Sequence, residues 1–162
     1  MSVRFPILCL ALSLGACASY DGRGLLPGTA TEAEVRQLMG TPALEMADAD
    51  GARQWAYPRG PSGVHTYMVH IAPAGQLARI EQVLDEAHFA LVVPGRSTQE
   101  TVMRLLGPPR LTLEFSRLAQ TAWDYRYRDA WGYTADFSVM FSRNGVVVSK
   151  FTQRVDGDGR HR

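Results

Sequence analysis

Two stretches of the chain carry the same order of polar and apolar positions. Residues 25–42 read LLPGTATEAEVRQLMGTP, and residues 92–109 read VVPGRSTQETVMRLLGPP. In both, apolar residues recur at i, i+3 and i+4, the spacing of one face of an α-helix. They are Val35, Leu38 and Met39 in the first copy and Val102, Leu105 and Leu106 in the second. The pattern predicts two short helices, each with one apolar stripe.

Start and stop signals enclose the first stripe. Thr31 is placed to cap the helix, and Glu34, three residues later, completes a capping box. Gly40 offers the left-handed residue that ends a helix, and Pro42 prevents continuation. Upstream, residues 20–26 include Gly22 and Gly24 and are followed by Pro27, so a leading helix is expected to be shortened or absent in this copy.

The second copy repeats these signals. Ser97 or Thr98 is expected to start its helix, with Glu100 available to Ser97 for a capping box. Gly107 is expected to end the helix, and two prolines follow it. Residues 85–93 are predicted to form a short preceding helix, so that this copy begins with a helical hairpin.

After each helix the apolar period changes to two, which predicts β-strands. Aromatic residues alternate first, at Trp55 and Tyr57 in one copy and at Trp123, Tyr125 and Tyr127 in the other. A second alternating run follows, at Tyr67, Val69 and Ile71 and at Phe137, Val139 and Phe141. Turns with Gly75 or Gly145 then predict hairpins into last strands at residues 77–83 and 146–151. The alternation in these last strands is irregular, which a bulge or an edge position would explain.

Each copy therefore predicts a helix or helix pair packed on an antiparallel sheet of about three strands. The fold class is α+β, with two tandem two-layer modules at residues 27–84 and 85–153. A module of roughly 60 residues buries little apolar surface, so the two are expected to support each other. Residues 154–162 are predicted to be a disordered tail.

The start of the chain has the pattern of a bacterial lipoprotein signal peptide, residues 1–16. Residues 5–14 are almost entirely apolar, but ten helical residues rise only about 15 Å, half of a membrane core. The exit LGAC, at residues 14–17, resembles a lipobox. Cys17 is expected to carry a diacylglyceryl and an N-acyl lipid, with residues 17–26 as a lipidated linker. The alternative is a standard signal peptide that contains a cysteine.

Processing at that site changes the composition. It removes Cys9 and Arg4, which leaves sixteen basic and sixteen acidic side chains and one cysteine whose sulfur carries lipid. These features argue against disulfides, a cysteine metal site and nucleic acid as a partner. Ala18 and Ser19 follow the lipidated residue without an Asp that would favour retention in the inner membrane, so we expect outer-membrane placement.

The lipobox, the doubled Pro-Gly helix signature ending in Gly-x-Pro, the Trp-x-Tyr pair and the Gly-containing hairpin resemble the SmpA/OmlA (BamE-like) family. The resemblance covers nearly the whole processed chain, one family module per copy. It implies a small outer-membrane lipoprotein that faces the periplasm, lacks catalysis, and assists the machinery that inserts β-barrel proteins, with contacts to another lipoprotein and to anionic phospholipid. Two tandem modules depart from that family and are similar to β-lactamase inhibitor proteins, whose sheets grip an enzyme.

Candidate partner-binding residues lie in the second copy. Trp131 and Tyr133 are predicted in a loop between two strands, next to Arg126 and Arg128 on the polar sheet face. Aromatic and Arg side chains concentrate binding energy at protein interfaces. The alternative is that Trp131 folds back over the open end of the sheet. Arg59 occupies the matching loop of the first copy without an aromatic neighbour.

The histidines give little support for metal binding or catalysis. His65 and His70 lie at odd spacing in one predicted strand, so they face opposite sides and cannot share a metal there. His88 is expected on a solvated helix face, and His161 lies in the tail. The DGDG stretch from Asp156 lacks the remaining ligands of a calcium loop. The sequence shows no catalytic or phosphate-binding motif.

These observations predict a non-enzymatic lipoprotein with a protein-binding role in outer-membrane protein assembly or envelope maintenance. The expected partner is a periplasmic or outer-membrane protein, the barrel-assembly machinery included, and no metal or cofactor other than the lipid is expected. Two alternatives stay open. One is an inhibitor-like protein that blocks a periplasmic enzyme, and the other is a small periplasmic hydrolase that uses His65, His70 or His88.

Overall fold

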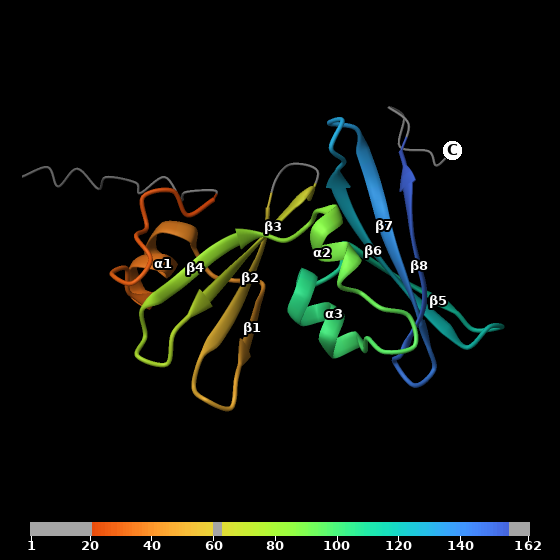
Figure 1. The fold of residues 1–162 in the computed structure, drawn as a ribbon, viewed down its shortest axis with the longest axis horizontal. Helices are drawn as coiled ribbons and strands as arrows, with labels where there is room; N and C mark the ends of the chain where they lie inside the picture. Colours follow the sequence, from red (N-terminus) through yellow and green to blue (C-terminus); the bar gives the residue numbers. More distant parts are fainter. Residues whose placement is uncertain (1–20, 60–62, 156–162) are drawn as a thin grey trace, which may run out of the picture.

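The computed structural model describes residues 21–59 and 63–155, which form two modules of one design (Figure 1). The first contains α1 (Glu32–Met39), β1 (Leu44–Ala47), β2 (Arg53–Arg59), β3 (His65–Ile71) and β4 (Leu77–Gln82). The second contains α2 (Glu86–Ala90), α3 (Gln99–Leu106), β5 (Leu111–Phe115), β6 (Gln120–Arg128), β7 (Thr134–Ser142) and β8 (Val147–Arg154). Each sheet is antiparallel, with its strands in chain order. The predicted α+β class and the tandem modules are confirmed.

The helix starts follow the predicted signals, with one difference. At α1, the Thr31 hydroxyl accepts the Glu34 amide at 3.3 Å, and the Glu34 carboxylate accepts the Thr31 amide at 2.7 Å. At α3, Thr98 is the cap and accepts the Thr101 amide at 3.2 Å. Ser97 instead accepts an amide hydrogen bond from the preceding turn. The expected capping box between Ser97 and Glu100 is therefore replaced by a simple threonine cap.

The segments ahead of α1 and α3 differ between the modules, as predicted. Asp85 caps α2 inside the region predicted to be helical. Residues 21–26 form turns without a helix. Those turns are more than a linker, because Leu25 packs against the core of the first module and Gly22 lies close to Ile80.

Each sheet has four strands, one more than the sequence pattern predicts. The additional strands are β1 and β5, which pair with β2 and β6 at one edge of each sheet. All five residues of β5 are exposed, and Leu111, Leu113 and Phe115 alternate along it. Their period of two is a strand signal, but it marks an exposed edge strand and not a core strand.

The last strands also differ from the prediction in length and register. Strand β8 continues to Arg154, and the Val155 amide donates to the Thr134 carbonyl at 3.0 Å. The ordered second module therefore extends beyond the predicted boundary at residue 153. The pairing register shifts between His70 and Ile71 and between Met140 and Phe141. The extra residue at each shift belongs to an edge strand, β4 or β8, which explains the irregular alternation there.

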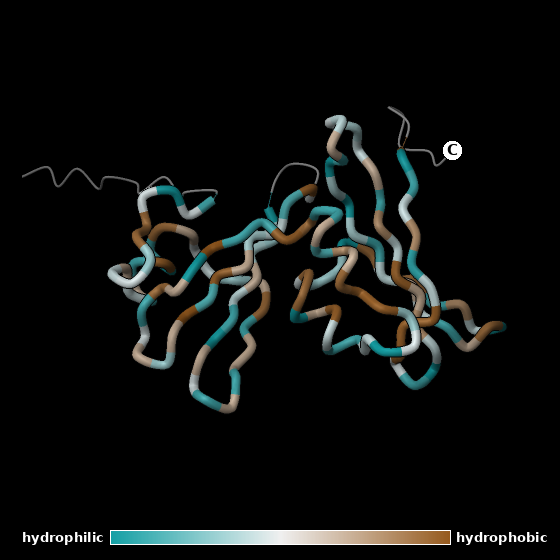
Figure 2. The backbone as a smooth tube through the Cα atoms, in the orientation of Figure 1, coloured by the Kyte–Doolittle hydropathy of each residue, from teal (hydrophilic) through white to brown (hydrophobic). Residues whose placement is uncertain are grey.

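The helical layer of the second module lies between the two sheets (Figure 1). Ala56 and Met68 of the first sheet share one core cluster with Val102 and Leu106 of α3 and with Tyr125 of the second sheet. In Figure 2, the helical segment between the two sheets carries many apolar residues. The order is therefore α1, first sheet, α2 with α3, second sheet. The first sheet is covered on both faces, whereas no described element covers the outer face of the second.

Polar contacts fix this stacking. Gln54 donates its side-chain amide to the Arg104 carbonyl at 2.6 Å, and the Arg104 guanidinium pairs with Asp48 at 2.6 Å. One side of each contact belongs to the first sheet or its β1–β2 turn and the other to α3. The expectation that the modules support each other is confirmed.

The repeated tyrosine has a structural role in both modules. The Tyr57 hydroxyl donates to the Gly40 carbonyl at 3.1 Å, and the Tyr125 hydroxyl donates to the Gly107 carbonyl at 3.1 Å. Each bond attaches the end of a helix to the second strand of the sheet beneath it. Burial raises the pKa of both tyrosines, so both stay protonated as donors. The repeated signature is thus explained by a helix-to-sheet clamp.

Candidate functional site

The predicted partner-binding residues lie at one end of the second sheet. Arg126 and Arg128 are at the end of strand β6, and Trp131 and Tyr133 are in the connection to β7. Trp131 is 81% exposed and Tyr133 is 59% exposed. The alternative in which Trp131 folds back over the sheet is therefore wrong.

The connection between β6 and β7, residues 129–133, is called the Trp131 loop, and Asp129 holds it in place. Its Oδ1 accepts the amides of Trp131 at 3.0 Å and Tyr133 at 2.9 Å, and its Oδ2 accepts Nε of Arg154 at 2.8 Å. The Arg154 guanidinium lies 4.5 Å from the centre of the Tyr133 ring. Arg128 donates to the Gly132 carbonyl at 3.0 Å. The loop is therefore ordered by bonds from β6, β8 and its own backbone.

The same contacts set the charge of Asp129. Burial alone would raise its pKa, but the Tyr133 amide, the Arg154 guanidinium and the Trp131 amide outweigh burial and lower that pKa. Asp129 is thus an ionised acceptor at neutral pH. Neither Asp129 nor Arg154 was among the site residues predicted from the sequence. An Asp at the start of a turn is a local signal for such side-chain-to-amide bonds, whereas no local signal identifies Arg154.

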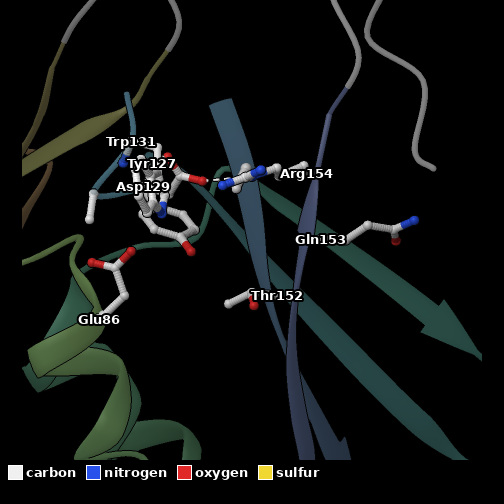
Figure 3. A pocket seen from close by; sticks show the side chains of 9 residues that line it. Glu86, Tyr127, Asp129, Trp131, Thr152, Gln153 and Arg154 are labelled. Carbon is white, nitrogen blue, oxygen red and sulfur yellow. Dashed lines mark hydrogen bonds and ion pairs between the residues drawn. The ribbon is translucent and has the colours of Figure 1, made fainter. Parts of the chain in front are cut away.

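A hollow of about 500 Å³ lies beside the loop, on the helical side of the sheet. It is lined by Glu86, Tyr127, Asp129, Ala130, Trp131, Ala135, Thr152, Gln153 and Arg154. Figure 3 shows the Glu86 carboxylate on the same side as Tyr127, with Thr152 below and Arg154 across the hollow. Burial raises the pKa of Tyr127, and the nearby Glu86 and Asp129 carboxylates raise it further. The hollow thus combines aromatic walls with acidic groups.

Arg126 lies on the opposite, outer face of the same sheet. Its Nε and Nη2 donate to the two carboxylate oxygens of Asp136 at 2.8 and 2.9 Å, and Arg110 lies 3.6 Å from Asp136. The hydrogen bonds to Asp136 raise the pKa of Arg126. Next to this pair, Ser138 donates to Asp124 at 2.6 Å. The structure therefore brings Arg128 to the Trp131 loop and separates Arg126 from it.

The remaining candidates lie elsewhere. Arg59 ends β2, donates to the Met39 carbonyl and stacks over Tyr57, so it is not a free loop residue. His65 stacks with Tyr67 on the α1 side of the first sheet. His70, on the opposite face, lies 2.8 Å from Glu81.

His70 has a lowered pKa, and His88 is less exposed than predicted. Burial, followed by the Arg79 charge, lowers the pKa of His70. His88 is not fully solvated, because its ring is partly buried and its Nδ1 lies 2.8 Å from Asp85. Across residues 21–59 and 63–155, no group of three potential His, Cys, Asp or Glu ligands comes together. The predictions for Cys17, His161 and the DGDG stretch fall outside these residues.

None of the helices within residues 21–59 and 63–155 is long and apolar enough to cross a membrane.

No family model matches the chain, and no curated protein matches it. Among solved structures, the chain is similar to the crystal structure of a DUF4309 family protein (YjgB) from Bacillus subtilis. The two share 16% identity over 80% of this chain and 81% of that chain, with a TM-score of 0.32. A likeness at this level carries no inference about function.

Proposed function

We propose that the chain is a non-enzymatic, lipid-anchored protein of the outer membrane that faces the periplasm and binds a protein partner through the Trp131 loop. The observation that carries this proposal is the 81% exposure of Trp131 on a loop that Asp129 holds in place. Exposed tryptophans lose much water-accessible apolar area on docking, and tryptophan is enriched among interface hot spots. A loop that is ordered before binding reduces the entropy lost on association.

The partner we favour is a subunit of the machinery that assembles outer-membrane proteins, or another envelope-maintenance protein. This choice rests on the resemblance of the sequence to BamE-like lipoproteins. The prominent Trp131 loop also fits the second candidate, an inhibitor-like role, because an exposed aromatic at a hairpin tip is suited to entering the cleft of a periplasmic enzyme. His70 and His88 lie in different modules and, within the described residues, do not come together in one cluster of ionisable side chains, so they do not form a shared hydrolytic centre.

Trp131→Ala is expected to weaken partner binding by at least about 30-fold, the loss of a typical hot spot. The measurement is affinity purification of the tagged protein from gently solubilised envelopes, followed by quantitative mass spectrometry. Leu118→Ala is the matched control, since Leu118 is also an exposed apolar residue, 64% accessible, in the β5–β6 turn. Recovery of barrel-assembly subunits with wild type and the control, but not with Trp131→Ala, supports the accessory role.

Other outcomes of this purification separate the candidates. A single periplasmic enzyme that loses activity in the complex would support the inhibitor-like role. Equal recovery of the partner with Trp131→Ala would contradict the loop as the contact. Recovery of no specific partner with wild type would contradict the binding role itself.

Cys17→Ser is expected to release the protein from the membrane fraction and to abolish labelling with a palmitate analogue. The reason is that only the Cys17 thiol lies at the lipobox exit, and two or more acyl chains are needed for stable anchoring. Cys9→Ser is the matched control, because Cys9 belongs to the predicted signal peptide. Membrane retention and labelling of Cys17→Ser at the wild-type level would contradict the lipid anchor.

A further inference from the structure

We propose that the hollow beside Trp131 binds a cationic side chain, lysine or arginine, of the protein partner. This inference rests on the proposed binding function and adds the chemistry of the contact. It depends on three features of the hollow: the Glu86 carboxylate without an ion-pair partner, the aromatic side chains that line the hollow, and the mutual neutralisation of Asp129 and Arg154.

The charges lining the hollow leave one negative group available. Asp129 and Arg154 neutralise each other at 2.8 Å, and Arg154 is further occupied by the Tyr133 ring. Glu86 also lines the hollow, and within the described part of the chain it makes no ion pair. Lys150 lines an adjoining hollow with Glu86, but its Nζ donates to the Phe89 and Ala90 carbonyls. The Glu86 carboxylate is therefore available to a cation that enters.

The Tyr127 hydroxyl reports the same sign of potential. Burial is the main cause of its raised pKa, and the charges of Glu86 and Asp129 add to it more than the charge of Arg154 subtracts. A phenol whose ionisation is opposed by neighbouring carboxylates lies in a negative field. That field favours a cation and opposes an anionic ligand.

The aromatic walls fit the same ligand. Trp131 and Tyr127 both line the hollow, and Glu86 lies close enough to Tyr127 for its charge to act on the hydroxyl. Indole and phenol faces attract guanidinium and ammonium groups within about 6 Å of the ring centre. An apolar side chain in the same place would cover the Glu86 carboxylate without pairing it, which is unfavourable. A cationic side chain satisfies the rings and the carboxylate together.

The test uses a peptide of defined charge. The intact chain, purified in mild detergent with ¹⁵N-labelled tryptophan, is titrated with acetyl-Gly-Arg-Gly-Arg-Gly-amide, and the indole N–H signal of Trp131 is followed. The matched probe carries citrulline, an uncharged analogue of arginine, at both positions. The arginine peptide is expected to shift the signal saturably and the citrulline peptide to bind at least five-fold more weakly.

Two isosteric variants locate the contact. Glu86→Gln is expected to weaken binding of the arginine peptide at least five-fold, and Glu114→Gln, which changes an exposed carboxylate on β5, is expected to leave it unchanged. Equal binding of the two peptides, or equal affinity of Glu86→Gln and wild type, would overturn the cation site. Equal losses in both variants would also overturn it, because general charge would then explain the binding.

The same variants, used in the envelope purification, separate this inference from the proposed function. If Trp131→Ala loses the partner and Glu86→Gln retains it at the wild-type level, the cation site is wrong and the binding role stands. If both variants lose the partner and Glu114→Gln retains it, both proposals are supported. If a cation-dependent peptide binds but no partner is recovered, the hollow is supported and the proposed function is wrong.

Discussion

Gly107→Ala is expected to destabilise the protein by about 4 kcal/mol, roughly twice the effect of Gly40→Ala. Both glycines end helices at a positive φ, 76° for Gly107 and 82° for Gly40, with ψ near −165° in a region that only glycine adopts readily. Only Gly107 faces a second module. A Cβ there would lie 3.1 Å from the Ala56 Cβ and 3.1 Å from the Thr66 Cγ2, whereas at Gly40 the nearest atom is an Arg59 nitrogen at 4.0 Å.

The additional loss at Gly107 arises because its neighbours cannot move away cheaply. The Ala56 Cβ is attached directly to the strand backbone, so relief requires α3 and the first sheet to separate. Urea unfolding of both variants measures the difference. Thr66→Ala, which deletes one of the two close contacts, is expected to restore part of the stability in the Gly107→Ala background only. Equal losses at Gly40 and Gly107 would mean that backbone strain alone matters and that module stacking contributes little.

The modules themselves were predictable from sequence, because their signals are local. The cap at Thr31, the stripe of Val35 and Met39 and the alternation around Trp55 each depend on residues within one or two turns of each other. The stacking was not predictable for the same reason. Gly107 and Gly40 stand in nearly identical motifs, and nothing near Ala56 in the sequence indicates that a helix from the other module covers it.

The candidate site shows the same division. Trp131 and Tyr133 were predicted because aromatic residues in a turn are visible in the sequence. The hollow beside them was not predicted, since Glu86 and Arg154 come from opposite ends of the second module and meet only through the packing of α2 on the second sheet. Arg126 was predicted to contact a partner, but in the structure it pairs with Asp136, the residue directly opposite it on β7.

Asp136→Ala is expected to cost about 3 kcal/mol, at the lower end for breaking a buried ion pair. The Asp136 side chain is 2% exposed and accepts two hydrogen bonds from Arg126, whose guanidinium loses its counterion in the variant. Partial exposure of Arg126 moderates the loss. The control is Glu45→Ala, because the Glu45–Arg36 pair has the same 2.8 Å separation but is 44% and 40% exposed. Its loss is expected to stay below about 1 kcal/mol.

Replacing both Arg126 and Asp136 separates the cost of leaving one charge unpaired from the net contribution of the ion pair to the free energy of unfolding. Arg126→Met/Asp136→Leu is expected to be close to wild type in urea unfolding or more stable, since it removes both charges of the buried pair and Arg110, 34% exposed, stays hydrated. A double variant as unstable as Asp136→Ala would contradict this and show that the pair itself stabilises the fold.

The Arg126–Asp136 pair and its neighbours Asp124 and Ser138 occupy positions that differ in role between the two sheets. Counted from the repeated Trp-x-Tyr and second-strand patterns, Asp124, Asp136 and Ser138 stand where the first sheet presents Ala56, Thr66 and Met68 to α3. The first sheet packs against α3 at these positions, whereas the second sheet carries paired polar residues there, and no described element covers its outer face. The stability difference between wild type and the apolar double variant therefore measures the cost of keeping the Arg126–Asp136 ion pair on that face.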